Sequence, residues 1–222
     1  MQPLFGRVLM MLATLAPLGG IVSAQDIASR KLGPDTLKSI ALAKVDPAFQ
    51  TTKLDRIALL PFANAAQFKD AASIISKNFV SQLSQLHSDY KFLSPDETIN
   101  FISTSNLNDE FNVFLGDYLT SNGGVARPDF LANLRTKLQI DAVLVGHVTK
   151  YGEIIEIRSF LGKPTRFKVS VVGVDMSLYR TTDGRRVWYG RDMIAAKNKN
   201  SLPDAAQAIS EVFARYFGRT PY

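Results

Sequence analysis

Two short, continuous apolar runs constrain the fold of this chain more than any other feature. They occupy residues 56–62 and 142–146, where Pro61 ends the first run and Gly146 closes the second. Such runs are typical of strands that are buried on both faces of a sheet. Between them, residues 69–87 carry apolar side chains at steps of three and four, which predicts a helix that covers the sheet.

Local start signals predict the remaining helices. Ser94, Pro95 and Glu97 form a capping pattern at the beginning of a helix over 94–102. We expect further helices over 107–119, 128–138 and 201–217, and a short strand over 90–93. Because strands and helices alternate in this way along the first half of the domain, the order predicts an α/β fold.

The second half of the chain has a different pattern, strict alternation of apolar and polar residues. Ile155 and Ile157 alternate with charged residues, and after a turn at 162–164 the residues 166–171 alternate again. This pattern predicts a β-hairpin with one face toward solvent. Its second strand should continue to Leu178, turn at Thr182-Asp183-Gly184 and return over 186–189.

The N-terminus predicts export. Residues 1–24 combine Arg7, an apolar stretch and a small-residue site that ends at Ala24, so we expect a signal peptide cleaved after Ala24. The alternative is a membrane anchor, but the apolar stretch is short and contains Pro17 and two glycines. The chain has no cysteine, which excludes lipidation at the cleavage point and disulfides. Residues 25–53 should form an arm, with an amphipathic segment over 34–44, that leads into a domain over 54–222.

Positive charge is concentrated in one part of the chain. The formal net charge is +6, and residues 150–199 hold eleven Lys or Arg against five acidic residues. A basic face on an exported protein can meet anionic lipid, cell-wall polymer or an acidic protein, whereas the alternative is an ordinary solvated surface. No nucleic-acid recognition motif is present, so we expect no nucleic-acid partner.

The residues that usually carry catalysis are scarce. Histidine occurs only at His87, which we expect near a helix end, and at His147, which follows Gly146 at the end of an apolar run. A packed His147 is favoured over a catalytic one, because no nucleophile motif or carboxylate cluster accompanies it. The pairs Asp96-Glu97 and Asp109-Glu110 are explained by helix starts. We therefore expect no catalytic, cofactor-binding or metal-binding residues and no enzymatic activity; a hydrolase that uses His147 is the minor alternative.

Trp188 allows two interpretations. It follows the Asp183-Gly184 turn, where a cross-strand core residue is the simpler expectation. The alternative is a hot spot for a partner, because arginines flank it on both sides. The flanking arginines remain available for a partner in either case.

Three segments together resemble a known family. Residues 57–64, 140–149 and 178–188 look like the envelope domains related to the curli secretion protein CsgG, the penicillin-binding-protein activator LpoB and the N-terminal domain of TolB. The resemblance implies a three-layer α/β/α sandwich with a mixed sheet flanked by helices, similar to an anticodon-binding domain. CsgG-like pores carry two membrane hairpins per subunit, whereas only the segment Glu153–Val172 is a candidate here.

These observations lead to a non-enzymatic periplasmic accessory protein. We expect it to bind another envelope protein, a cell-wall synthase or a secretion component, and to support assembly, secretion or cell-wall synthesis. An oligomeric, CsgG-like outer-membrane channel component is the alternative, with self-association and contact with the membrane periphery. The predicted partner-binding residues are basic: Arg158, Lys163, Arg166, Lys168, Arg185, Arg186 and Arg191.

Overall fold

The computed structural model describes residues 30–33, 35–51, 53–120, 127–160, 163–197 and 202–219. The predicted signal peptide therefore lies outside the described residues. The elements in chain order are β1 (Arg30–Lys31), η1 (Thr36–Lys38), β2 (Leu42–Val45), α1 (Pro47–Thr51), β3 (Arg56–Leu59), β4 (Ala63–Asn64), α2 (Ala71–Leu86), β5 (Lys91–Leu93), α3 (Pro95–Thr104), α4 (Asn108–Thr120), α5 (Pro128–Leu138), β6 (Ala142–Phe160), β7 (Lys163–Arg180), β8 (Arg186–Lys197) and α6 (Leu202–Arg215).

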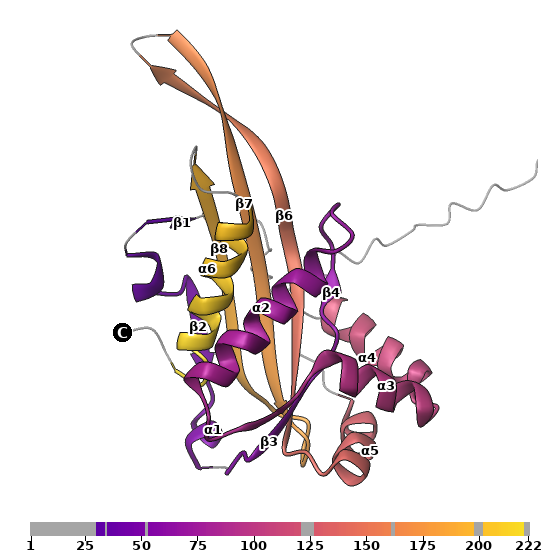
Figure 1. The fold of residues 1–222 in the computed structure, drawn as a ribbon. Helices are drawn as coiled ribbons and strands as arrows, with labels where there is room; N and C mark the ends of the chain where they lie inside the picture. Colours follow the sequence, from indigo (N-terminus) through magenta and orange to yellow (C-terminus); the bar gives the residue numbers. More distant parts are fainter. Residues whose placement is uncertain are drawn as a thin grey trace, which may run out of the picture.

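A single mixed sheet organises the molecule (Figure 1). Its strand order is β1-β8-β7-β6-β3-β5, and β2 pairs with β8 while β4 pairs with β6. The strands β3, β4 and β5 run parallel to their neighbours, and the long strands β6, β7 and β8 are antiparallel. Helices α2 and α6 lie side by side on one face. The predicted α/β sandwich with a mixed sheet is confirmed.

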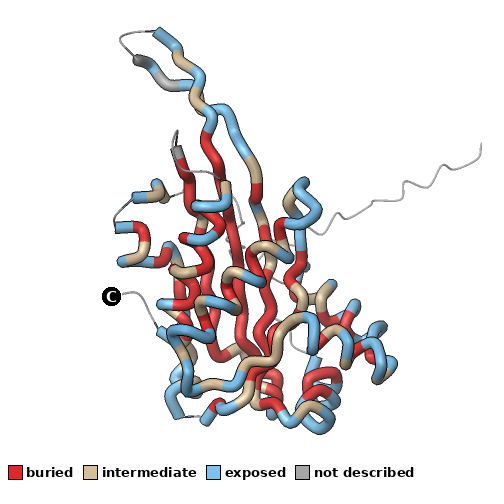
Figure 2. The backbone as a smooth tube through the Cα atoms, viewed as in Figure 1, coloured by how far each residue is buried: buried red, intermediate tan, exposed pale blue. Residues whose placement is uncertain are grey.

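A hydrophobic core lies between the sheet and the helices on each of its two faces. Along β3 and the residue that follows it, Ile57 and Leu59 face the core beneath α2 and α6, whereas Ala58 and Leu60 face the core beneath α3, α4 and α5. All four residues have no exposed surface, and the central part of the sheet is coloured as buried in Figure 2. The continuous apolar run is therefore explained, because each successive residue enters a different buried layer. Gly146 lets β6 approach Phe62, whose ring lies 2.5 Å from where a Cβ would be.

The predicted helices agree with the structure to within a few residues. The segment 69–87 forms α2, and α3 begins with a capping box in which Ser94 Oγ accepts from Glu97 N (3.2 Å) and Glu97 Oε2 accepts from Ser94 N (2.7 Å). None of the described helices has the length and apolar character needed to span a membrane.

The N-terminal segment differs from the prediction. The stretch 34–44 was expected to be amphipathic and to lead into the domain, but it contains a short 3-10 turn and then the strand β2. Strand β2 pairs antiparallel with β8, and Ile40 and Ala43 are buried in the first core. This strand pairing supplies the backbone hydrogen bonds and the apolar contact that a separate arm lacks.

The hairpin of β6 and β7 also differs from the prediction, in its register. Ile155 lies directly opposite Lys168, Ile157 opposite Arg166, and Glu156 opposite Phe167. Because directly opposite residues share a face of a sheet, each face of the hairpin mixes apolar and charged side chains. The expected single solvent face is therefore wrong: a shift of one residue in the pairing moves the apolar set of one strand to the other face.

Candidate interaction surface

The outer part of the β6–β7 hairpin projects beyond the rest of the molecule (Figure 1). On one side, the pairing of β4 with β6 ends at Asn64 and Val148; on the other, the pairing of β8 with β7 ends at Lys197 and Val169. Beyond these points β6 and β7 pair only with each other among the described residues. We call residues 150–168, without the two turn residues, the projecting hairpin.

The projecting hairpin exposes large apolar side chains. Ile155 is 64% exposed, Ile157 is 66% exposed and Ile154 is 48% exposed. A two-stranded ribbon gains little stability from leaving such side chains in water, because apolar surface is stabilising only when it is buried. Exposed apolar side chains that gather in one place mark interaction sites.

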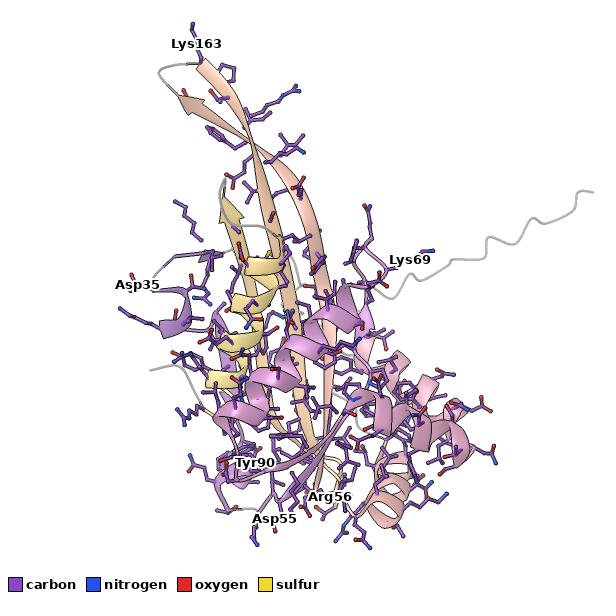
Figure 3. The ribbon with its side chains drawn as sticks, in the orientation of Figure 1. Asp35, Asp55, Arg56, Lys69, Tyr90 and Lys163 are labelled. Atoms are coloured by element: carbon purple, nitrogen blue, oxygen red, sulfur yellow. The ribbon has the colours of Figure 1, made fainter. Side chains whose placement is uncertain are left out.

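Cations accompany these isoleucines. Lys163, at the far end of the hairpin in Figure 3, Arg166 and Lys168 are exposed, and Lys168 Nζ lies 3.3 Å from Glu153. Ion pairs exposed to this degree contribute little stability, so Lys168 can exchange this partner for another. The surface is thus both apolar and positively charged.

A pocket lies at the base of the projecting hairpin. Its volume is about 350 Å³, and it is bounded by the loop after β4 and by β6 where β4 no longer pairs with it. Phe68, which is 46% exposed, stacks on Tyr151 beside it with ring centroids 5.4 Å apart. The lining residues are Ala65, Ala66, Gln67, Thr149, Lys150, Tyr151, Gly152, Glu153, Ile154 and Val171.

The predicted basic residues do not form one surface. Lys163 is the first residue of β7 and Arg185 follows its last residue, and the 18 residues of this strand extend about 55 Å at roughly 3.3 Å per residue. Lys163, Arg166 and Lys168 belong to the projecting hairpin, and the side chain of Arg158 lies outside the described part of the structure. The expectation of a shared surface is therefore wrong.

The three predicted arginines that follow β7 in the sequence already have partners within the protein. Arg185 lies 2.7 Å from Asp46, and the guanidinium of Arg186 lies 4.9 Å from the ring centroid of Tyr189. Arg191 is only 5% exposed, and it donates to both carboxylate oxygens of Asp175 at 2.8 Å. Arg191 is therefore part of the interior and is removed from the predicted surface.

The Asp175–Arg191 pair belongs to a buried polar row that the sequence pattern did not reveal. Asp175 lies directly opposite both His147 on β6 and Arg191 on β8. Burial raises the pKa of Asp175, which the hydrogen bonds from Arg191 offset only in part, and burial lowers the pKa of His147. Alternation along β7 suggested a solvated face here, but α4 covers it with Phe114 and Tyr118.

Two hydroxyls beside this row are buried, those of Tyr118 and Ser177. Burial raises the pKa of Tyr118 well above its ordinary value, so its hydroxyl stays protonated. The row thus pairs one carboxylate with one guanidinium, and a half-buried histidine lies beside them. This arrangement is that of a structural ion pair, in which Arg191 compensates the buried charge of Asp175.

The other residues considered for chemistry have structural contacts. His87 ends α2, and its Nε2 lies 2.7 Å from the carbonyl oxygen of Ala214. Trp188 is 1% exposed and packs edge-on against Phe213 and Phe217, which confirms the core interpretation. Within the described ranges, no group of three or more His, Asp or Glu side chains is placed to hold a metal ion.

Comparison with known proteins gives structural similarity at low sequence identity. No family model and no curated protein matches the sequence. Lipoprotein GNA1162 from Neisseria meningitidis is 19% identical, with 72% of this chain and 99% of that chain covered and a TM-score of 0.49. The PelC dodecamer from Paraburkholderia phytofirmans is 16% identical, with 81% of this chain and 97% of that chain covered and a TM-score of 0.47. The LpoB C-terminal domain from Salmonella enterica is 8% identical, with 66% of this chain and 85% of that chain covered and a TM-score of 0.36. All three TM-scores are below 0.5, so the fold assignment rests on the strand order and cores of this chain.

Proposed function

We propose that this protein is a non-enzymatic accessory protein of a bacterial envelope, which binds another envelope protein and thereby supports assembly, secretion or cell-wall synthesis. The observation that carries the proposal is the projecting hairpin, with three exposed isoleucines beside exposed cations. The predicted signal peptide and the family resemblance of residues 57–64, 140–149 and 178–188 support the location.

A binding role explains this hairpin better than a structural one. Apart from Tyr151 at its base, its described side chains belong to neither of the two large cores. Exposed β-branched residues on an extended ribbon also carry a risk of aggregation. A partner that covers Ile155 and Ile157 would remove both the exposed apolar surface and this risk.

Photo-crosslinking in intact cells tests the proposal. A photoreactive residue at position 157 should capture another envelope protein, whereas the same residue at position 137, exposed on α5, should not. Equal capture from both positions, or no capture at 157, would contradict the proposal. Capture of only a second copy of this chain would replace it with the self-assembling alternative.

Two charge-reversal variants test whether capture depends on the cations of the hairpin or only on the net charge of the protein. The variant Arg166→Glu with Lys168→Glu should reduce crosslinking from position 157 several-fold. Arg135→Glu with Lys137→Glu makes the same change in net charge on the exposed surface of α5, and it should leave capture unchanged. An equal loss in both variants would show that net charge, and not this surface, controls capture.

A further inference from the structure

The outer half of β6 has a free edge, which indicates how a partner could bind. Strand β4 pairs with β6 only to Val148, and the backbone of β6 from Tyr151 to Phe160 has no strand beside it on that edge among the described residues. Unpaired backbone N–H and C=O groups on an edge strand form a template for another extended chain.

The hydrogen bonds show which residues present this template. Leu60 N donates to Leu144 O (2.8 Å) and Ala65 N donates to Val148 O (3.0 Å), so even-numbered residues of β6 point their backbone groups toward β3 and β4. The bulge between Val148 and Lys150 inserts one residue and reverses this parity. From Tyr151 onward the odd-numbered residues point outward, which places the N–H groups of Ile155 and Ile157 on the free edge.

The opposite edge of the hairpin, formed by β7, is less suited to pairing with an added strand. The outer segment of β7 begins Lys163-Pro164, and proline has no N–H to donate. Between Lys150 and Phe160, β6 contains no proline, and its exposed isoleucines add an apolar surface. The β6 edge is therefore the one suited to pairing with another chain.

We propose that the β6 edge binds an extended segment of the partner protein by strand addition, and that this segment alternates apolar and acidic residues. The added strand would continue the position that β4 leaves at Asn64, and its first residues would occupy the pocket at the base of the hairpin. This inference rests on the proposed function, which it deepens by specifying how the partner binds.

The chemistry of the segment follows from the side chains around the edge. An added strand lies about 4.8 Å from β6, so its apolar residues would pack beside Ile155 and Ile157. The exposed cations Lys150, Lys163, Arg166 and Lys168 outnumber Glu153 and Glu156 in the projecting hairpin. This excess of positive charge favours an acidic segment over a basic one.

The first test uses amide hydrogen exchange on the mature chain and needs no variant. The probe is a fluorescent eight-residue peptide of alternating Val and Glu, with a Val-Lys peptide of the same length as control. The Val-Glu peptide should slow exchange of the N–H groups of Glu153, Ile155 and Ile157, while those of Ile154 and Glu156, which point toward β7, should change little. Absence of this alternation would overturn strand addition, as would equal binding of the Val-Lys peptide.

A matched pair of variants provides the second test. Ile155→Pro removes one outward N–H and places a ring on the free edge, so it should weaken binding of the Val-Glu peptide by about tenfold or more. Ile155→Ala also loses apolar contact but keeps the N–H, so it should bind the Val-Glu peptide several-fold more tightly than Ile155→Pro does. Equal binding by the two variants would overturn the proposal. In that case persistent crosslinks from position 157 would still support the proposed function, by a contact of another kind.

Discussion

At the residue scale, the Asp175–Arg191 pair is the most consequential contact that the sequence did not reveal. Both side chains are nearly inaccessible to water, at 8% and 5% exposure, and they are joined by two hydrogen bonds of 2.8 Å. The cost of burying either charge alone is large, and each charge compensates the other.

Removing one partner should therefore destabilise the protein strongly. Arg191→Ala should lower the free energy of unfolding, measured by urea denaturation, by about 3–5 kcal/mol, because it leaves the Asp175 carboxylate without compensation. The double variant Arg191→Ala with Asp175→Ala should recover part of this loss. If Arg191→Ala changed stability by less than about 1 kcal/mol, the buried-pair interpretation would be wrong.

His147 gives the same region a dependence on pH. Burial lowers its pKa, with Arg191 acting in the same direction and Asp175 opposing it, so the folded protein binds a proton at His147 less readily than the unfolded chain does. Its effect on stability is therefore absent above the unfolded pKa of about 6.5 and grows as the pH falls toward the folded value.

We expect the free energy of unfolding to decrease between pH 8 and pH 5.5, with His147 responsible for part of the decrease. In His147→Gln this difference should be smaller, because the variant has no group that titrates at this position. The measurement is urea denaturation of both proteins at the two pH values. An unchanged difference in the variant would show that other groups account for the pH dependence.

At the element scale, the start of α3 is the best example of structure encoded locally. Pro95 occupies the first turn, and the capping box of Ser94 and Glu97 satisfies two backbone N–H groups that the helix cannot pair internally. Ser94→Ala should cost about 1 kcal/mol of stability by urea denaturation, whereas Ser94→Thr should retain most of the cap. Equal stability of the two variants would contradict this role.

Elements with local signals could be predicted from the sequence, and those that depend on distant pairing could not. Helices α2, α3 and α5 carry their periodicity and caps within their own residues. Strand β2 has only four residues, and its pairing with β8 joins residues about 145 positions apart. No local pattern encodes that contact.

The candidate site shows the same division. The sequence indicated a hairpin near residues 153–172 and a concentration of cations, and both are present in the structure. It did not indicate the bulge between Val148 and Lys150. This bulge changes which residues of β6 share a face with the apolar residues of β7, and which of them point their backbone groups toward the free edge. Arg191 resembled the other cations, because its partner Asp175 lies on the neighbouring strand, 16 residues away.

At the scale of the whole molecule, the chain consists of a layered body and a ribbon that extends from it. The body holds both large cores, and the projecting hairpin extends beyond it (Figure 2). Of the described side chains of the hairpin, only that of Tyr151, at its base, belongs to a large core. This separation allows the hairpin to be removed with little effect on folding, since its outer residues make no contribution to either core. The stability of the body and the binding by the ribbon can therefore be measured independently.

The most direct test of this account is a truncation of the hairpin. Ile154 and Val169 lie directly opposite each other, so residues 155–168 can be replaced by Asn-Gly, a two-residue turn suited to antiparallel strands. We predict that the truncated protein keeps its melting temperature within a few degrees and that it no longer co-purifies with the partner after chemical crosslinking in intact cells. Unchanged recovery of that partner by a folded, truncated protein would contradict the central claim that the projecting hairpin is the binding element.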